Sequence, residues 1–186
     1  MPTLRFTSAR EWEAWLEENH RRSGGIWLEI ARQDSGVPSV SYGEALDAAI
    51  CFGWIDGQKG AGEGTFWRQR FGPRGPRSKW SAINRERGER LEREGRLRDA
   101  GRQEVERARQ DGRWDSAYEG QRQATVPEDL RAALERDPEA LAFFQTLSGA
   151  NRYAILYRVQ DAKRPETRAR RIEQYVAMCR EHRTLH

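Results

Sequence analysis

Residues 51–80 hold the side chains of this chain that are best suited to chemistry, in the sequence CFGWIDGQKGAGEGTFWRQRFGPRGPRSKW. Trp54, Trp67 and Trp80 offer flat apolar rings. The basic residues among them offer guanidinium and ammonium groups that suit a carboxylate, a phosphate or an aromatic face; they are Arg68, Arg70, Arg74, Arg77 and Lys79. The stretch therefore predicts a cleft lined by Trp and Arg that binds a small compound, either anionic or aromatic.

Two residues in this stretch could support a reaction instead. Cys51 is a candidate nucleophile, but we expect it at the C-terminal end of a helix, where the helix dipole disfavours a thiolate. The three histidines lie near the chain ends, so no general base stands beside it in the sequence. Asp56 is a candidate acid, base or amine ligand, and an ion pair with an arginine is the preferred interpretation. No catalytic residue is predicted, and an enzyme that uses Asp56 or Cys51 stays an alternative.

Motifs for metals and cofactors are missing from the sequence. Cys51 and Cys179 lie far apart without CxxC or CxxH spacing, so we expect reduced thiols and neither a disulfide nor a zinc site. No phosphate-loop motif is present, and we expect no cofactor. No apolar run is long enough for a signal peptide or a membrane span, so the expected location is cytoplasmic.

Positive charge concentrates in two stretches of the chain. Residues 66–90 contain seven Arg and one Lys against two Glu, and residues 158–171 contain five Arg and one Lys against two acidic residues. Such patches could contact a nucleic-acid backbone. Because acidic residues dilute both stretches, we do not expect nucleic-acid binding, and an accessory protein that binds nucleic acid is kept as a second alternative.

The elements that must position these side chains are indicated by capping signals and by hydrophobic periodicity. Three pairs fit the capping box and predict helix starts: Ser8 with Glu11, Ser41 with Glu44, and Thr125 with Glu128. Residues 25–32 alternate apolar and polar side chains, which predicts a strand, and residues 54–59 and 65–71 predict two more that pair through the turn GAGEG. Helices are predicted over 9–20, 42–52, 81–94, 99–110, 128–136, 139–147, 150–162 and 166–181.

These elements predict an α+β fold, with a small antiparallel β-sheet and helices in the N-terminal part and an all-helical module after it. We expect residues 1–110 to form the α+β part with the candidate site, residues 111–126 to form a connection or a lid, and residues 127–186 to form the helical module. Nothing in the sequence indicates an oligomeric state.

Three blocks of the chain resemble one protein family. The blocks are CFGWIDGQ at 51–58, QRFGPRGPRSKWSAINRERGERL at 69–91 and SGANRYAILYRVQDAKRPETRARRIEQYVAM at 148–178, and they are similar to the YdeI/OmpD-associated family, also called OmdA or bacteriocin-protection proteins. The resemblance implies an α+β part followed by a helical module, and an association with stress or antimicrobial tolerance. It also adds Asn84 to the site.

Together these observations predict a cytosolic binding protein associated with stress or antimicrobial tolerance, with a small-molecule ligand as its partner. The expected ligand-binding residues are Trp54, Asp56, Trp67, Arg68, Arg70, Arg74, Trp80 and Asn84. Among these we expect Arg70, Arg74 and Trp80 to meet Trp54 in one cleft.

Overall fold

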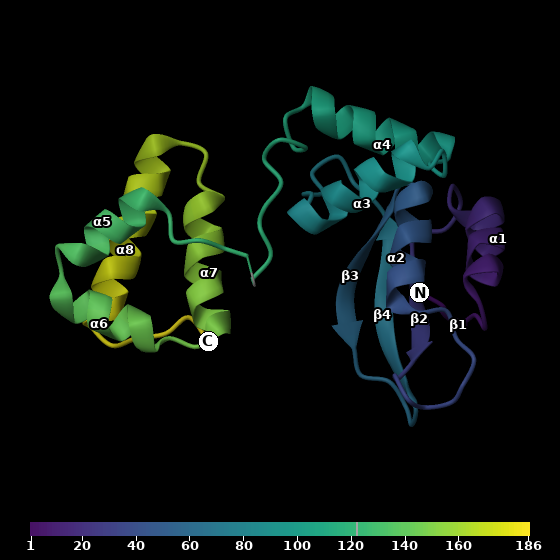
Figure 1. Cartoon of the computed structure of the whole chain (residues 1–186), viewed down its shortest axis with the longest axis horizontal. Coiled ribbons are helices and arrows are strands. Elements are labelled where there is room, and N and C mark those ends of the chain that lie inside the picture. Colours follow the sequence, from purple (N-terminus) through teal and green to yellow (C-terminus); the bar gives the residue numbers. More distant parts are fainter. Residues whose placement is uncertain (122) are drawn as a thin grey trace. The chain divides into compact units, whose positions relative to one another are not determined.

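The structure, a computed structural model, describes residues 1–121 and 123–186. Residue 122, which falls in the segment predicted as a connection or lid, lies outside the described residues. The chain divides into two compact units (Figure 1). Unit 1 consists of residues 1–80 and 84–117, and unit 2 of residues 81–83 and 118–186. The predicted α+β class is confirmed.

Unit 1 contains a four-stranded sheet in the order β1-β2-β4-β3. The strands are β1 (Thr3–Arg5), β2 (Ile26–Ala31), β3 (Trp54–Gly60) and β4 (Phe66–Pro73). β4 pairs antiparallel with β3, as predicted, and the third predicted strand, β2, pairs antiparallel with the other side of β4. β1 pairs parallel with β2 and was not predicted, because three residues are too few to show an alternating pattern.

Eight helices are present among the described residues, each within two residues of its predicted bounds. They are α1 (Ala9–Asn19), α2 (Tyr42–Cys51), α3 (Ala82–Arg93), α4 (Asp99–Gln110), α5 (Glu128–Glu135), α6 (Pro138–Thr146), α7 (Gly149–Gln160) and α8 (Pro165–Arg180). No helix in this part of the chain combines the length and the apolar character needed to cross a bilayer.

The three predicted capping boxes have different outcomes. At α2 the box is complete: Ser41 accepts from the amide of Glu44, and the Glu44 carboxylate accepts from the amide of Ser41. At α1, Ser8 accepts from the amide of Glu11, but the Glu11 carboxylate accepts from Thr7 instead. The box at Thr125 is wrong. Pro127 occupies the N-cap of α5 without a side-chain hydrogen bond, and its ring presets the backbone for a helix start two residues later than Thr125.

Within the described residues of unit 1, helices cover only one face of the sheet. Ile26, Leu28 and Ile30 of β2 are buried, whereas Trp27 between them is half-buried. Since side chains alternate between the two faces of a strand, Trp27 and Glu29 lie on the opposite face. We call this second face the open face.

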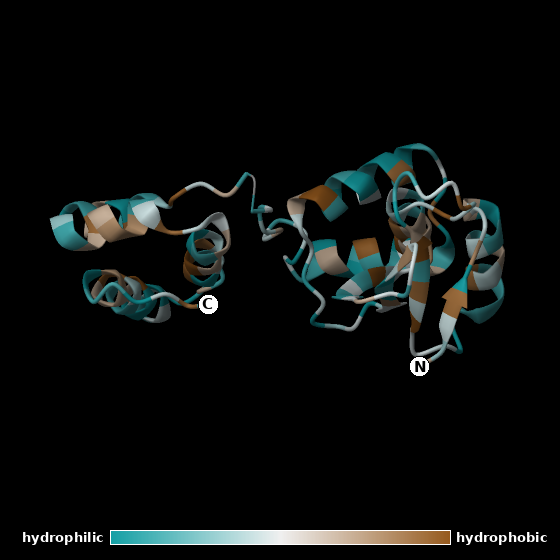
Figure 2. Cartoon of the chain, turned by 90° about the horizontal axis from the view of Figure 1, so that it is seen from below, coloured by the Kyte–Doolittle hydropathy of each residue, from teal (hydrophilic) through white to brown (hydrophobic). Residues whose placement is uncertain are grey.

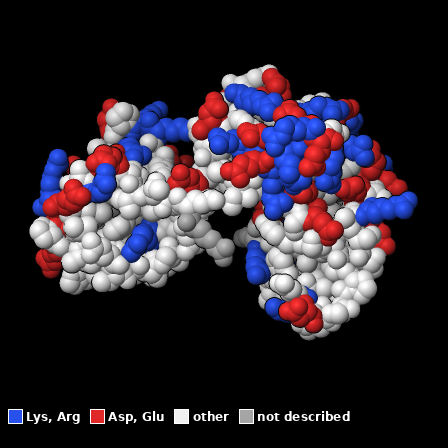
Figure 3. Space-filling view, viewed as in Figure 1, with Lys and Arg blue, Asp and Glu red and all other residues white. Residues whose placement is uncertain are grey.

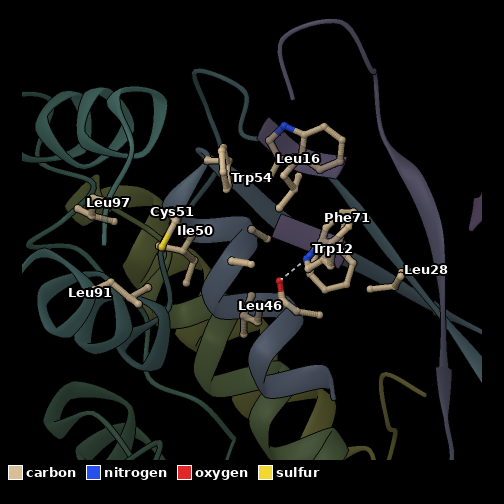
Figure 4. Close-up of a cluster of buried hydrophobic side chains, with 14 of the residues drawn as sticks. Trp12, Leu16, Leu28, Leu46, Ile50, Cys51, Trp54, Phe71, Leu91 and Leu97 are labelled. Carbon is tan, nitrogen blue, oxygen red and sulfur yellow. Dashed lines mark hydrogen bonds between the residues drawn. The ribbon is translucent and has the colours of Figure 1, made fainter. Parts of the chain in front are cut away.

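Trp12 of α1 connects α1 and α2, two helices that cover the sheet, to the strands beneath them (Figure 4). Its side chain is fully buried, and its indole N–H donates to the carbonyl of Ala45 in α2 at 3.0 Å. The Trp12 ring centroid lies 5.8 Å from that of Phe71 in β4 and 6.3 Å from that of Trp54 in β3. One side chain thus fixes α1, α2 and the sheet in one core.

Unit 2 has its own core, formed by α5 to α8. Leu130, Leu134, Ile155 and Val159 are among its fully buried residues. In Figure 2 brown and teal residues alternate along the helices of both units, as expected when each helix buries one side.

Two helical glycines of unit 1 give a matched test of this packing. A Cβ on Gly101 in α4 would lie 2.3 Å from the carbonyl oxygen of Cys51, whereas a Cβ on Gly43 in α2 would meet nothing within 4 Å. Gly101→Ala should therefore lower the stability of unit 1 by about 1–3 kcal/mol. Gly43→Ala should raise it by about 0.5–1 kcal/mol, because alanine is the better helix former.

Denaturation followed by tryptophan fluorescence measures this difference in unit 1 alone, since all seven tryptophans lie there. Equal unfolding midpoints for the two variants would contradict the close approach of α4 to the end of α2.

Candidate functional site

Four of the predicted site residues do not line one cleft. Trp54 and Trp80 are each 1% exposed and Arg74 is 5% exposed, so these three side chains lie in the core of unit 1. Arg70 is exposed on the sheet. The expected meeting of Arg70 with the other three is therefore absent.

Trp54 has a structural environment. Its indole N–H donates to the carbonyl of His20 at 3.1 Å, which satisfies the last turn of α1. Its ring meets those of Trp12 and Trp15 edge-on, with centroids 6.3 Å and 5.9 Å away. Trp54 thus fastens β3 to α1.

Arg74 and Trp80 form a buried cation–π stack. The guanidinium carbon of Arg74 lies 3.5 Å from the centre of the Trp80 ring, and Arg74 Nη1 donates to the carbonyl of Lys79. Trp80 in turn meets Trp114 at a centroid distance of 4.8 Å. A guanidinium on an aromatic face is favourable in the core as well as in a ligand site. The stack of Arg74 on Trp80 therefore anchors the GPRGPRSKW loop that follows β4.

Glu104 of α4 is a buried carboxylate near this stack. It is 8% exposed, its Oε1 lies 3.0 Å from Arg107, and its Oε2 has no hydrogen-bond partner among the described residues. Burial raises the pKa of Glu104, although the nearby Arg107, Arg113 and Arg74 oppose the shift.

Asp56 of β3 and Trp67 of β4 both contact Tyr42 of α2. The Tyr42 hydroxyl donates to Asp56 Oδ2 at 2.7 Å, and the Tyr42 and Trp67 ring centroids are 5.9 Å apart. The ammonium of Lys59 lies 4.7 Å from the Trp67 ring centre. The expected ion pair between Asp56 and an arginine is absent among the described residues, because the Tyr42 hydroxyl takes that position.

Arg68 lies on the open face, in a short row of charges. Glu29 accepts from Arg5 at 2.6 Å and from Arg68 at 3.1 Å. The hydrogen bond from Arg5 lowers the pKa of Glu29, so this largely buried carboxylate is ionised at neutral pH. The guanidinium carbon of Arg5 also lies 3.7 Å from the Phe66 ring centre.

Trp27 of β2 lies beside this row, and its ring extends across the neighbouring strand β4. In the register of the sheet Trp27 pairs with Arg70, while Arg68 pairs with Gly60 of β3. A Cβ on Gly60 would stand 3.0 Å from Cζ3 of Trp27, so the indole reaches over β4 to β3 between Arg68 and Arg70. Any larger residue at position 60 would push the Trp27 ring away by a few tenths of an ångström. We call Trp27, Arg68 and Arg70 the Trp27 platform.

Of the predicted residues, the Trp27 platform therefore holds Arg68 and Arg70. Asn84 is half-buried in the first turn of α3 and is not on the sheet. Trp27 was not predicted as a ligand contact, although the alternation of residues 25–32 places it opposite Ile26, Leu28 and Ile30. That alternation is the signal that could have identified it.

The described residues contain no group of three or more His, Cys, Asp or Glu that could hold a metal ion. Both cysteines are free and buried. Burial raises the pKa of the Cys51 thiol to about 11. In Figure 4 its sulfur lies on the side of the core where Leu91 and Leu97 pack.

Two protein-family models match different parts of the chain. Residues 4–104 match the family described as "Domain of unknown function (DUF8412)". The chain belongs to the DUF8412 family. Residues 123–182, which follow the DUF8412 region, match the family described as "Bacteriocin-protection, YdeI or OmpD-Associated", or OmdA. No curated protein and no solved structure matches the chain.

The predicted OmdA resemblance is confirmed over part of the chain. The first two blocks that suggested it, at 51–58 and 69–91, lie in the DUF8412 region and outside the OmdA match. The Trp27 platform also lies in the DUF8412 region.

Both thiols of this DUF8412 protein should be unreactive while it is folded. With a pKa of about 11, Cys51 is almost wholly a thiol at pH 8, and thiols react slowly with disulfide reagents. Burial raises the pKa of Cys179 as well. Ellman's reagent at pH 8 should label neither cysteine in native protein and both in denaturant. Rapid native labelling mapped to Cys51 would contradict this result and revive the enzyme alternative.

The raised pKa of Glu104 predicts a pH-dependent effect of Glu104→Gln. When the pH is below the ordinary pKa of glutamate, the side chain is protonated in both the folded and the unfolded state, so folding buries no charge at this position. As the pH rises towards 7, the wild-type protein must either bury a charge or keep a proton, which lowers its stability. Stability of the variant relative to wild type should thus increase from pH 4 to pH 7 in urea titrations. A constant difference would show that Glu104 titrates normally.

Proposed function

We propose that this protein binds a small anionic aromatic compound on the Trp27 platform, and that it is a cytosolic protein acting in stress or antimicrobial tolerance. The observation that carries the proposal is the Trp27 indole, which lies on an uncovered sheet face between two arginines. An aromatic ring can stack on the indole while its anionic group meets a guanidinium.

The two arginines of the Trp27 platform contribute differently. Arg68 already shares Glu29 with Arg5, so part of its charge is neutralised. Arg70 is exposed and makes no ion pair with any described residue. Arg70 is therefore the anchor for the anionic group of the ligand, and Arg68 helps to hold the aromatic ring of the ligand.

The tolerance role rests on the match of the C-terminal part to a family described by bacteriocin protection. A protein that sequesters a harmful compound needs an accessible binding surface and no reactive group. The surroundings of Cys51 and Asp56 agree with that role. One is a buried thiol with a raised pKa, and the other accepts a hydrogen bond from Tyr42.

The charge distribution does not favour the nucleic-acid alternative. Figure 3 shows basic and acidic residues interleaved over the part of unit 1 where α3 and α4 lie. Arg87 and Arg90 of α3 both pair with Asp47, and Arg168 of α8 pairs with Asp129. Arginines held in this way are not available to phosphates.

Ligand binding is tested by thermal shift with 1-naphthyl phosphate, an aromatic ring with an anionic group. Binding to the folded protein must raise the unfolding temperature. Arg70→Gln should weaken the apparent affinity about tenfold, the usual effect of one lost charge-assisted contact. Arg77→Gln removes the same charge at an exposed position of the loop after β4 and should have no effect.

The neutral analogue 1-naphthol should stabilise both variants and the wild type equally weakly. No stabilisation by 1-naphthyl phosphate and a wider panel of aromatic anions, or equal effects of both substitutions, would contradict the proposal.

Nucleic acid is distinguished from a small ligand by the salt dependence of binding. We expect no micromolar binding of single-stranded or duplex oligonucleotides at about 0.15 M salt, because carboxylates pair with six of the twelve arginines in the two basic stretches and Arg74 is buried. Fluorescence anisotropy measures this directly. Micromolar binding with a steep loss of affinity on added salt would favour the nucleic-acid alternative.

A further inference from the structure

Unit 2 contains a pocket that is independent of the Trp27 platform. Its volume is about 310 Å³, at the lower end of the range for small-molecule sites. Helices α5, α6 and α7 and the residue before Pro127 form it. The lining side chains that matter most here are Val126, Leu134, Leu141, Phe144, Arg131 and Arg152.

The wall of this pocket is mostly apolar. Leu134 and Phe144 belong to the buried core of unit 2, and Val126 and Leu141 are half-buried and pack against that core. An apolar group in the pocket would therefore leave water for an apolar surface, which is favourable.

Arg152 of α7 is one of the polar residues that line the pocket. Its guanidinium carbon lies 5.6 Å from the Phe144 ring centre, and Nη2 donates to the carbonyl of Gln145 at 2.9 Å. Its Nε is buried and has no hydrogen-bond partner within the described part of the chain. Nη1 also has no hydrogen-bond partner among the described residues and, unlike Nε, it is accessible, so it can donate to a ligand in the pocket.

The charges around the pocket indicate how many negative charges that ligand carries. Arg131 pairs with Glu128, and Glu135 contributes a negative charge to the lining. Arg152 has no acidic partner among the described residues. These four charges sum to zero, but the Arg152 guanidinium is not paired with a described carboxylate, so it can bind a single anionic group.

We propose that this pocket binds an amphiphilic monoanion, a compound with one carboxylate or sulfonate and an aryl or short alkyl group. The apolar group lies against Leu141 and Phe144, and the anionic group accepts hydrogen bonds from the Arg152 guanidinium. This site lies in the OmdA region and does not depend on ligand binding by the Trp27 platform.

The test uses two probes of nearly the same shape on the full chain. 1-Anilinonaphthalene-8-sulfonate carries one negative charge, and N-phenyl-1-naphthylamine is its uncharged analogue; both fluoresce more strongly in apolar surroundings. Arg152→Gln should weaken binding of the sulfonate about tenfold and leave binding of the amine unchanged. Arg136→Gln, which removes an exposed arginine outside the pocket lining, should change neither.

A second variant tests the pocket without removing charge. Leu141→Trp places a larger ring in the pocket and should abolish binding of both probes, provided that circular dichroism shows an unchanged helical fold. Either no binding of the sulfonate to wild type or equal affinity in Arg152→Gln would overturn the inference. Loss of sulfonate binding in Arg70→Gln instead would also overturn it, because the probe would then occupy the Trp27 platform.

Discussion

The indole of Trp12 is the contact on which unit 1 depends. Its N–H bonds to Ala45 in α2, and its ring packs against Phe71 of β4 and Trp54 of β3. α1, which carries Trp12, and α2 are thereby held on the same face of the sheet. A sheet covered on one face must send every second side chain of its strands to the other face. The open face, with everything proposed for it, is a consequence of this packing.

The open face is ordered by its own contacts. Glu29 lies between Arg5 and Arg68 and holds both, and Gly60 leaves space for the Trp27 ring to cross β4. The Trp27 platform is therefore formed before any ligand arrives, which reduces the entropy lost on binding. Arg70 keeps its charge for a partner in solution, whereas Arg74, four residues later and just after the end of β4, is buried over Trp80.

Helices and strands of this protein could be predicted from the sequence because caps, prolines and alternation are local signals. The site could not be predicted in full. Trp and Arg close together favour a buried cation–π stack as much as a ligand site, and sequence spacing does not distinguish Arg74 over Trp80 from Arg70 beside Trp27. Pairing between strands decides which arginine is exposed, and that pairing is not local. The alternation at 25–32 did place Trp27 on the opposite face of the strand from Ile26, Leu28 and Ile30. The sequence alone does not show that the helices leave the face of Trp27 uncovered.

The most direct test of this account is the indole N–H spectrum of the protein. All seven tryptophans lie in unit 1, and each gives one resonance in a ¹⁵N–¹H correlation experiment. Titration with 1-naphthyl phosphate should shift the Trp27 resonance most and leave those of the buried Trp12, Trp54 and Trp80 almost unmoved. If the Trp27 resonance stays in place while that of Trp54 or Trp80 shifts, the ligand enters the core instead, and the account of the open face is wrong.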